Sequence, residues 1–259
     1  MTARRVRACG ALVAAHALLS GTLVIAQPSP EALQTFRATY GLFDGSKRVG
    51  SAEFTLRYDA STARYTYESR AEFDGLLVRL ARPRPMIERS EFRIERGEIR
   101  PLSYVYRDGS RGGRRDLTLE FDWGRQQLAI TRADEPTALP MPEHAIDRAS
   151  VKLALALAVR DGRRAGRLDV ADPDEFRTHE FATDGMERLH TPAGELDAYR
   201  VKQWRAESSR ETFVWLAPAL GFHAVRIEQH RPDRDPVAFV LESFERLEPD
   251  GSPAAVTAQ

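Results

Sequence analysis

Apolar and polar residues alternate along most of the chain, which is typical of half-buried antiparallel strands. The first alternating run covers residues 35–42 and a second covers residues 53–58. Between them, Asp44-Gly45 supplies the residue types that adopt positive φ in tight turns. We therefore expect a β-hairpin at the start of the folded domain.

The same alternation recurs along the chain, so about a dozen strands are expected, at the spacing of a sandwich or barrel. The further runs are residues 65–67, 87–94, 102–106, 117–123, 128–130, 176–183, 196–206, 211–216, 222–229 and 237–244. Turn signals separate several of them, at Asp74-Gly75, Arg96-Gly97, Asp108-Gly109 and Trp123-Gly124.

One segment, Arg148–Arg160, reads as a helix instead. Asp147 is placed to accept the first free amides, and Gly162 is placed to end the helix in a left-handed cap. Its large apolar residues spread around most of the circumference, so the helix requires burial on nearly all sides. They also alternate as in a strand, but the intervening alanines favour a helix. An extended connector with three prolines (136, 140 and 142) precedes it, and a charged loop, residues 161–167, follows.

The N-terminus has the pattern of a secretory signal peptide. Arg4, Arg5 and Arg7 precede an apolar run that ends at Ile25, and small residues surround Ala26. An uncleaved membrane anchor is the alternative, but polar residues interrupt the run and Pro28 follows directly. We expect cleavage after Ala26, a single β-rich domain over residues 27–247, and a disordered tail over residues 248–259.

Removal of the first 26 of 259 residues changes the formal charge from zero to −3, because three arginines and no acid are lost. Such a chain has no general electrostatic attraction for nucleic acid or for anionic lipid. The single cysteine, Cys9, lies inside the signal segment. The mature chain therefore has no disulfide, no thiol catalyst and no cysteine-metal site. Because of the signal peptide, we expect a periplasmic protein.

Candidate catalytic patterns are weak. The histidines lack the spacing of metal ligands on one helix face, and no Gly-x-Ser-x-Gly nucleophile motif is present. Glu195 and Asp197 share one face of a predicted strand, as a glycosidase pair would, but solvated strand positions explain them better. A basic cluster, Arg111 to Arg115, would suit phosphate or anionic lipid head groups, although acids flank it in a predicted turn.

Aromatic residues on the predicted strands either fill a core or line an apolar cavity beneath the helix. On the cavity interpretation, the ligand-binding residues are Tyr40, Tyr67, Tyr104, Leu153, Leu157 and Trp215. No catalytic residue, metal or cofactor is assigned.

Several segments resemble the exported bacterial family known as domain of unknown function 3108. They include Leu117–Trp123, Thr191–Gly194 and above all the Thr212–Pro218 segment, Thr-Phe-Val-Trp-Leu-Ala-Pro. The resemblance covers about residues 33–231, and it implies an envelope protein whose activity is not established. Its layout is similar to that of the half-barrel lipoprotein carriers of the periplasm, although fold analogy does not fix function.

We expect a mainly β fold, with a large antiparallel sheet that forms a half-barrel or open barrel around one buried helix. The predicted function is non-enzymatic binding of an apolar or amphipathic envelope ligand, such as a lipid, by a monomer that has no stable membrane insertion. A cell-wall or polysaccharide hydrolase is one alternative. A structural or assembly factor that presents a sheet edge to an outer-membrane partner is another.

Overall fold

A computed structural model describes residues 33–248 and Ser252, and most of these residues lie in one open sheet of 15 strands. The strands are β1 (Phe36–Asp44), β2 (Lys47–Asp59), β3 (Arg64–Phe73), β4 (Met86–Glu95), β5 (Glu98–Arg107), β6 (Leu117–Asp122), β7 (Gln127–Arg132), β8 (Glu135–Pro140), β9 (Ala145–Ile146), β10 (Ala165–Ala171), β11 (Phe176–Thr191), β12 (Gly194–Trp204), β13 (Glu211–Ala217), β14 (His223–Arg231) and β15 (Arg234–Arg246). The helices are α1 (Leu76–Ala81), α2 (Val151–Arg160) and a 3-10 turn, η1 (Pro218–Leu220).

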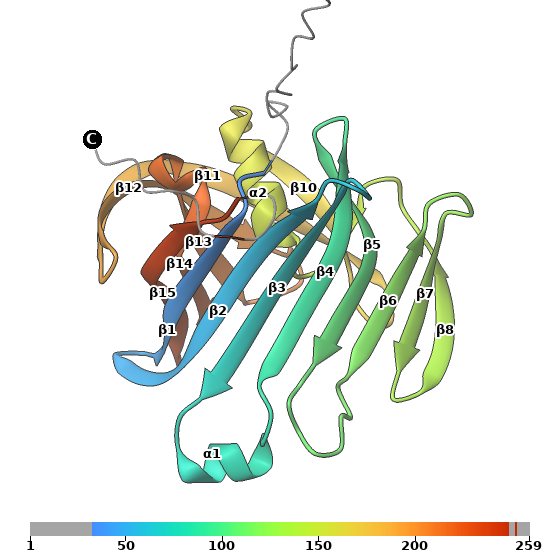
Figure 1. Cartoon of the computed structure of the whole chain (residues 1–259), viewed down its shortest axis with the longest axis horizontal. Helices are drawn as coiled ribbons and strands as arrows, with labels where there is room; N and C mark the ends of the chain where they lie inside the picture. Colours follow the sequence, from blue (N-terminus) through green and yellow to red (C-terminus); the bar gives the residue numbers. More distant parts are fainter. Residues whose placement is uncertain (1–32, 249–251, 253–259) are drawn as a thin grey trace, which may run out of the picture. The chain divides into compact units, whose positions relative to one another are not determined.

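The strand order is β8-β7-β6-β5-β4-β3-β2-β1-β15-β14-β13-β12-β11-β10-β9, so the first and last long strands, β1 and β15, pair with each other in the middle of the sheet (Figure 1). Each half of the sheet is a meander of neighbouring strands. The β9–β10 pair is parallel, and the other described pairs are antiparallel. This architecture confirms the expected large antiparallel sheet.

The first hairpin forms as the alternation predicts. Phe36, Tyr40 and Leu42 on β1 are buried, while Arg37 and Thr39 between them are partly exposed. Gly45 at the turn has φ 58°, a left-handed conformation that glycine adopts without steric cost. Sequence alone therefore sets both the inner face and the turn of this hairpin.

Helix α2 is the single buried helix that the sequence predicts, but it begins at Val151 rather than at Arg148. Asp147 causes the difference, because its carboxylate accepts the amide of Ser150 at 2.9 Å and closes a turn in front of the helix. The far end matches the prediction. Gly162 has φ 82°, and the amide of Arg163 donates to the carbonyl of Ala158 at 2.8 Å, as in a Schellman cap.

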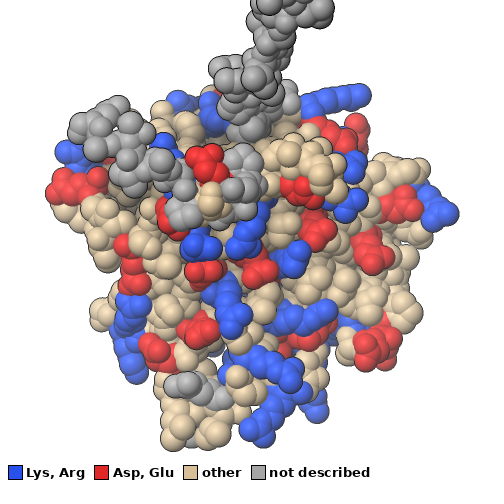
Figure 2. Space-filling model, in the orientation of Figure 1, with Lys and Arg blue, Asp and Glu red and all other residues tan. Residues whose placement is uncertain are grey.

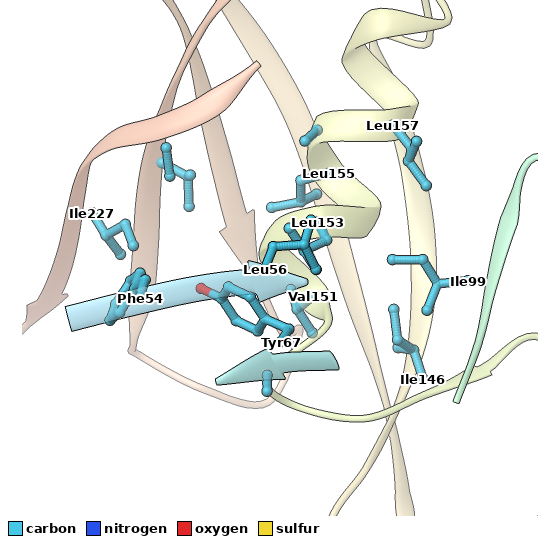
Figure 3. Packing of buried hydrophobic residues seen from close by; sticks show 14 of the residues in the cluster. Phe54, Leu56, Tyr67, Ile99, Ile146, Val151, Leu153, Leu155, Leu157 and Ile227 are labelled. Atoms are coloured by element: carbon cyan, nitrogen blue, oxygen red, sulfur yellow. The ribbon is translucent and has the colours of Figure 1, made fainter. Parts of the chain in front are cut away.

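The core lies between α2 and the inner face of the sheet (Figure 3). Leu155 and Leu157 are 0% and 1% exposed, so the helix is covered on opposite sides, as its apolar circumference requires. Leu157 lies near Ile99 and Ile146, whereas Ile227 lies on the other side of the helix. A ten-residue helix is marginal alone, so burial of its leucines, worth roughly 1.5–3 kcal/mol each, stabilises it.

Three segments differ from their predicted structure. The expected loop over residues 161–167 ends early, because strand β10 begins at Ala165 and pairs with β11. The proline-containing connector forms the edge strand β8, where a proline without an N–H group is tolerated. The expected turn at Asp74-Gly75 leads into the short helix α1.

The predicted signal peptide, residues 1–26, lies outside the described residues, as does most of the predicted tail, residues 248–259. Within the part of the chain that the structure covers, no helix is long and apolar enough to cross a membrane.

Candidate functional site

A buried polar network precedes α2. Asp147 is 0% exposed, and its carboxylate accepts hydrogen bonds from the Ser90 hydroxyl at 2.6 Å and the Ser150 hydroxyl at 2.8 Å. Burial raises the pKa of Asp147, and the hydrogen bonds from both serines oppose that rise. The network ties the start of α2 to strand β4, which carries Ser90.

A second group of polar side chains positions Arg148. The Tyr104 hydroxyl donates to Glu88 at 2.9 Å, and the same carboxylate lies 3.5 Å from the guanidinium of Arg148. The guanidinium carbon also lies 5.5 Å from the centre of the Tyr106 ring, within cation–π range. Arg148 therefore has a defined position at the entrance to α2.

Lys152 lies one turn further along α2. Its ammonium nitrogen is 5.7 Å from the ring centres of both Phe54 and Tyr67, and no carboxylate of the described chain lies within the 4.0 Å of an ion pair. Burial lowers the pKa of Lys152, while Glu88 and Asp147 oppose that shift from a greater distance. Lys152 is partly exposed, but an ammonium without an ion-pair partner beside apolar side chains is costly, so this residue has the character of a functional group.

Lys152 lines a cavity of about 330 Å³ between α2 and strands β10–β14, which we call the α2 cavity. One part of the wall is apolar and includes Val151, Val170, Val214 and Ile227. The remainder is polar and charged, with Arg148, Lys152, Asp172, His179, Gln203, Arg205 and Arg210. Figure 3 shows Val151 of α2 and Ile227 of β14 at this side of the helix.

The charged wall has an excess of positive charge. Asp172 is its single acid, and this carboxylate already contacts Arg177 at 2.9 Å and Arg205 at 3.8 Å. Burial lowers the pKa of Arg210, and neighbouring arginines, Arg231 first, lower it further. Arginines that repel one another in this way provide favourable positions for an anion.

His179 lies on the same wall as a neutral hydrogen-bonding group. The amide nitrogen of Gln203 donates to Nδ1 of His179 at 2.5 Å. Burial, followed by the charge of Arg205, lowers the pKa of His179 to about 4. An anion bound nearby would offset both effects and raise that pKa.

A second cavity, of about 260 Å³, lies on the opposite side of α2. Leu157, Ile99 and Phe181 are among its apolar lining residues, and Arg163 and Arg167 are among the charged ones. Leu157 is thus a predicted ligand-binding residue that lines a cavity.

The other predicted binding residues pack in the core. Tyr40, Tyr67 and Tyr104 are at most 1% exposed, and Leu153 and Trp215 are both 6% exposed. Tyr67 reaches the α2 cavity indirectly through Lys152, and Tyr104 does so through Glu88 and Arg148. Direct contact between these five residues and a ligand stays a prediction.

Sequence reasoning did not single out Lys152, Arg205 or Arg210. A signal for Lys152 exists, because it is the one charged residue inside the otherwise apolar Val151–Val159 stretch. A charged side chain in a helix that is buried on all sides must have a partner, a route to solvent or a functional role.

The carboxylate pair of the hydrolase alternative lies outside both cavities. Glu195 and Asp197 are exposed on β12, where Glu195 contacts the imidazole of His190 and Asp197 contacts the guanidinium of Arg188, both on β11 and both at 2.9 Å. Neither carboxylate is shielded from water, and each is already in contact with a side chain of the neighbouring strand. The arrangement is that of cross-strand contacts between polar side chains on a solvated face.

Comparison with known proteins places the chain in a family. The family described as "Protein of unknown function (DUF3108)" matches residues 35–238, most of the domain that carries the α2 cavity. The chain belongs to this family. The match confirms the resemblance that the sequence motifs indicate. A search of curated proteins finds no match to this DUF3108 chain.

One solved structure shares the fold. The DUF3108 chain is similar to a β-barrel-like protein of the family DUF1849 from Brucella abortus, with a TM-score of 0.51 and 8% identity over 83% of this chain and 99% of that one. A candidate lipoprotein from Parabacteroides distasonis has a TM-score of 0.29 and 10% identity, over 83% and 97% of the two chains. A candidate exported protein with a YmcC-like fold from Bacteroides fragilis has a TM-score of 0.32 and 11% identity, over 83% and 100%.

Proposed function

We propose that this DUF3108 protein is an exported, non-enzymatic binding protein that holds an amphipathic envelope molecule in the α2 cavity. The observation that carries the proposal is the placement of Lys152, which opens into the cavity without an ion-pair partner. A ligand with an anionic group would supply that partner. The apolar part of the wall would cover the start of its hydrocarbon chain.

The chemistry of the wall favours an anionic amphiphile over a neutral one. Arg148, Lys152 and Arg210 line the cavity from two sides, the first two from α2 and the turn before it and the third from the segment before β13. Arginine and lysine recognise phosphate and carboxylate groups through charge-assisted hydrogen bonds. The side chains of His179 and Gln203 also carry N–H groups, which can donate a hydrogen bond to the same anion.

Calorimetric titration with two amphiphiles of equal chain length tests the proposal. Decyl phosphate carries the anion, and decyl glucoside is its neutral counterpart. We expect decyl phosphate to bind at least about tenfold more tightly, and Lys152→Met to abolish that preference, since a charge-assisted contact is worth about 1.5–3 kcal/mol. Lys47→Met, at an exposed position on β2, is the matched control and retains it. Equal affinity of both amphiphiles for the native protein would refute the proposal.

Export is the second element of the proposal, and the Arg4–Ala26 pattern supports it. Mass spectrometry of the protein from fractionated cells tests it directly. We expect an extracytoplasmic fraction with an N-terminus at Gln27. An intact Met1 on the bulk of the protein would refute export and leave the binding proposal to its own test.

A further inference from the structure

Helix α1, between β3 and β4, exposes apolar side chains to an unusual extent. Leu76 is 75% exposed, Leu80 55% and Val78 40%. The described chain has five exposed large hydrophobic residues, and three of them lie on this six-residue helix. Clustered exposure of this kind marks an interaction surface, whereas scattered exposed residues do not.

The loop between β5 and β6, residues 108–116, lies directly beside α1. The amide of Arg84, in the segment that follows α1, donates to the carbonyl of Gly109 at 3.3 Å. The guanidinium of Arg82 donates to the carbonyl of Asp108 at 3.4 Å and lies 5.7 Å from the centre of the Phe73 ring. These contacts join the two segments into one surface, which we call the α1 tip.

The α1 tip has exposed arginines that form no ion pair with the described residues, although the charge of Arg115 helps to lower the pKa of Asp108. They are Arg84, Arg111, Arg114 and Arg115, and none forms an ion pair within 4.0 Å with a described residue. Two acids of the tip are already engaged, since Asp108 accepts hydrogen bonds from Ser110 and Asp116 lies 3.6 Å from Arg107. The chain as a whole has zero formal charge, so this positive excess is local.

Figure 1 shows α1 beyond the ends of the strands that flank it, and Figure 2 shows Lys and Arg side chains gathered at the same end, beside residues without charge. Apolar side chains therefore project at the extremity of the domain, with cations around them. A membrane interface requires this arrangement, because apolar groups enter the acyl boundary while long cationic side chains reach the head groups.

We propose that the α1 tip docks on the surface of a bilayer that contains anionic phospholipid. Leu76, Val78 and Leu80 enter the interface, and the arginines of the 108–116 loop pair with lipid phosphates. Charge complementarity selects this occupant, since unpaired arginines next to exposed leucines match an anionic lipid surface. The inference uses residues distant from the α2 cavity and stands or falls independently of ligand binding there.

Vesicle co-sedimentation tests the proposal on the protein as exported, with its N-terminus identified by mass spectrometry. The probes are vesicles of phosphatidylcholine alone and vesicles in which part of it is replaced by phosphatidylglycerol. We expect binding to the phosphatidylglycerol vesicles, and strong weakening when ionic strength rises from about 0.1 M to 1 M, where the Debye length falls from about 10 to 3 Å.

Two sets of variants separate the charged and apolar contributions. The triple change Arg111→Gln, Arg114→Gln and Arg115→Gln should weaken binding about a hundredfold, at about fivefold for each arginine near an anionic surface. The double change Leu76→Asn and Leu80→Asn should weaken it at least tenfold, because the insertion of leucine side chains is lost. These residues are exposed, so circular dichroism and melting temperature should stay unchanged.

Control variants carry the same changes elsewhere. Arg96→Gln changes the β4–β5 turn and Arg125→Gln changes the β6–β7 turn, both at the strand ends opposite to the α1 tip. Met186→Asn removes an exposed apolar side chain from β11. We expect these to bind as the native protein does. Equal binding to both vesicle types, equal losses in tip and control variants, or no binding to either vesicle would overturn the proposal. The last outcome would direct attention to a protein partner for the tip.

Discussion

The hydroxyl of Tyr40 lies 2.5 Å from Nε2 of His223, and it lies at the same distance from the carbonyl oxygen of Ala224. The tyrosine has one proton, and the carbonyl can only accept, so Tyr40 donates to Ala224 and His223 donates to Tyr40. The pair joins β1 to β14 across β15, in the middle of the sheet. Both side chains are buried, so each hydrogen bond replaces one that water would make.

Replacement of Tyr40 by Phe should lower the free energy of unfolding by about 2 kcal/mol, because it leaves the His223 N–H and the Ala224 carbonyl unpaired in the core. Urea denaturation followed by tryptophan fluorescence measures the change. Tyr199→Phe is the control, since Tyr199 is half-buried on β12 and stacks on Phe222 through its ring alone. A loss of equal size in both variants would contradict a specific role for the Tyr40 hydroxyl.

The stability of the protein should fall on acidification because of His223. Burial lowers its pKa from 6.5 to about 3, so the unfolded chain binds a proton in that interval while the folded protein does not. The contribution is complete above pH 6.5 and is lost progressively toward pH 3, at about 1.4 kcal/mol per unit.

The difference between the native protein and His223→Gln isolates that contribution, since carboxylates titrate in both. Asp147, whose pKa is raised, works in the opposite sense and is likewise present in both. Denaturation midpoints at a series of pH values measure the difference. Parallel pH profiles for the two proteins would show that His223 does not titrate on unfolding.

Asp147→Ala should lower the free energy of unfolding by roughly 3 kcal/mol, because three buried donors of Ser90 and Ser150 lose their acceptor. Asp59 offers a matched control. It accepts a similar set of three donors from Ser61 and Thr62, but in an exposed turn where water replaces the lost acceptor. Thermal denaturation of Asp59→Ala should show a much smaller loss. Similar losses would mean that burial does not determine the cost.

Local patterns account for the elements that sequence predicts well. The β1–β2 hairpin follows from alternation and from Gly45, and α2 follows from an apolar circumference and from Gly162, all of which are properties of neighbouring residues. Strand β10 follows from a different cause. Its sequence contains Gly166 and Arg167, and it becomes a strand because β11 is long enough to pair with it.

The candidate site was less predictable because its residues meet only through the fold. The α2 cavity joins Lys152 of α2 to Arg210 and to Ile227 of β14, positions that no periodic pattern relates. Large size on a strand is the feature that marks the predicted tyrosines, and size on an inward face also describes a core residue. Charge in an apolar helix was the more informative signal.

Gly109→Ala tests the junction between α1 and the 108–116 loop. A Cβ atom there would lie 2.3 Å from the carbonyl oxygen of Arg84, so the two segments must separate. Gly97 is the control, because its φ of 77° is close to the 74° of Gly109 while its surroundings are empty. Both variants place a Cβ atom on a left-handed backbone, which lowers the free energy of unfolding. Gly109→Ala should lower it by roughly 1–3 kcal/mol more than Gly97→Ala does. Equal melting temperatures of the two variants would show that the two segments can separate without a loss of stability.

Lys152→Met should stabilise the unliganded protein while it weakens anion binding. The lowered pKa of Lys152 shows that burial disfavours its charge, and methionine fills a similar volume without that cost. We expect the free energy of unfolding to rise by about 1 kcal/mol, which is within the usual range for a stabilising substitution. Lys47→Met, at an exposed position, should change neither property.

The sign of the change decides between two roles for Lys152. If the ammonium were a structural element of the core, its loss would destabilise the protein in denaturation experiments whether or not decyl phosphate were present. If it is held ready for an anion, decyl phosphate should raise the melting temperature of the native protein and leave that of Lys152→Met nearly unchanged, because ligand stabilisation follows affinity. A destabilised Lys152→Met protein would therefore contradict the binding role on grounds independent of the calorimetry.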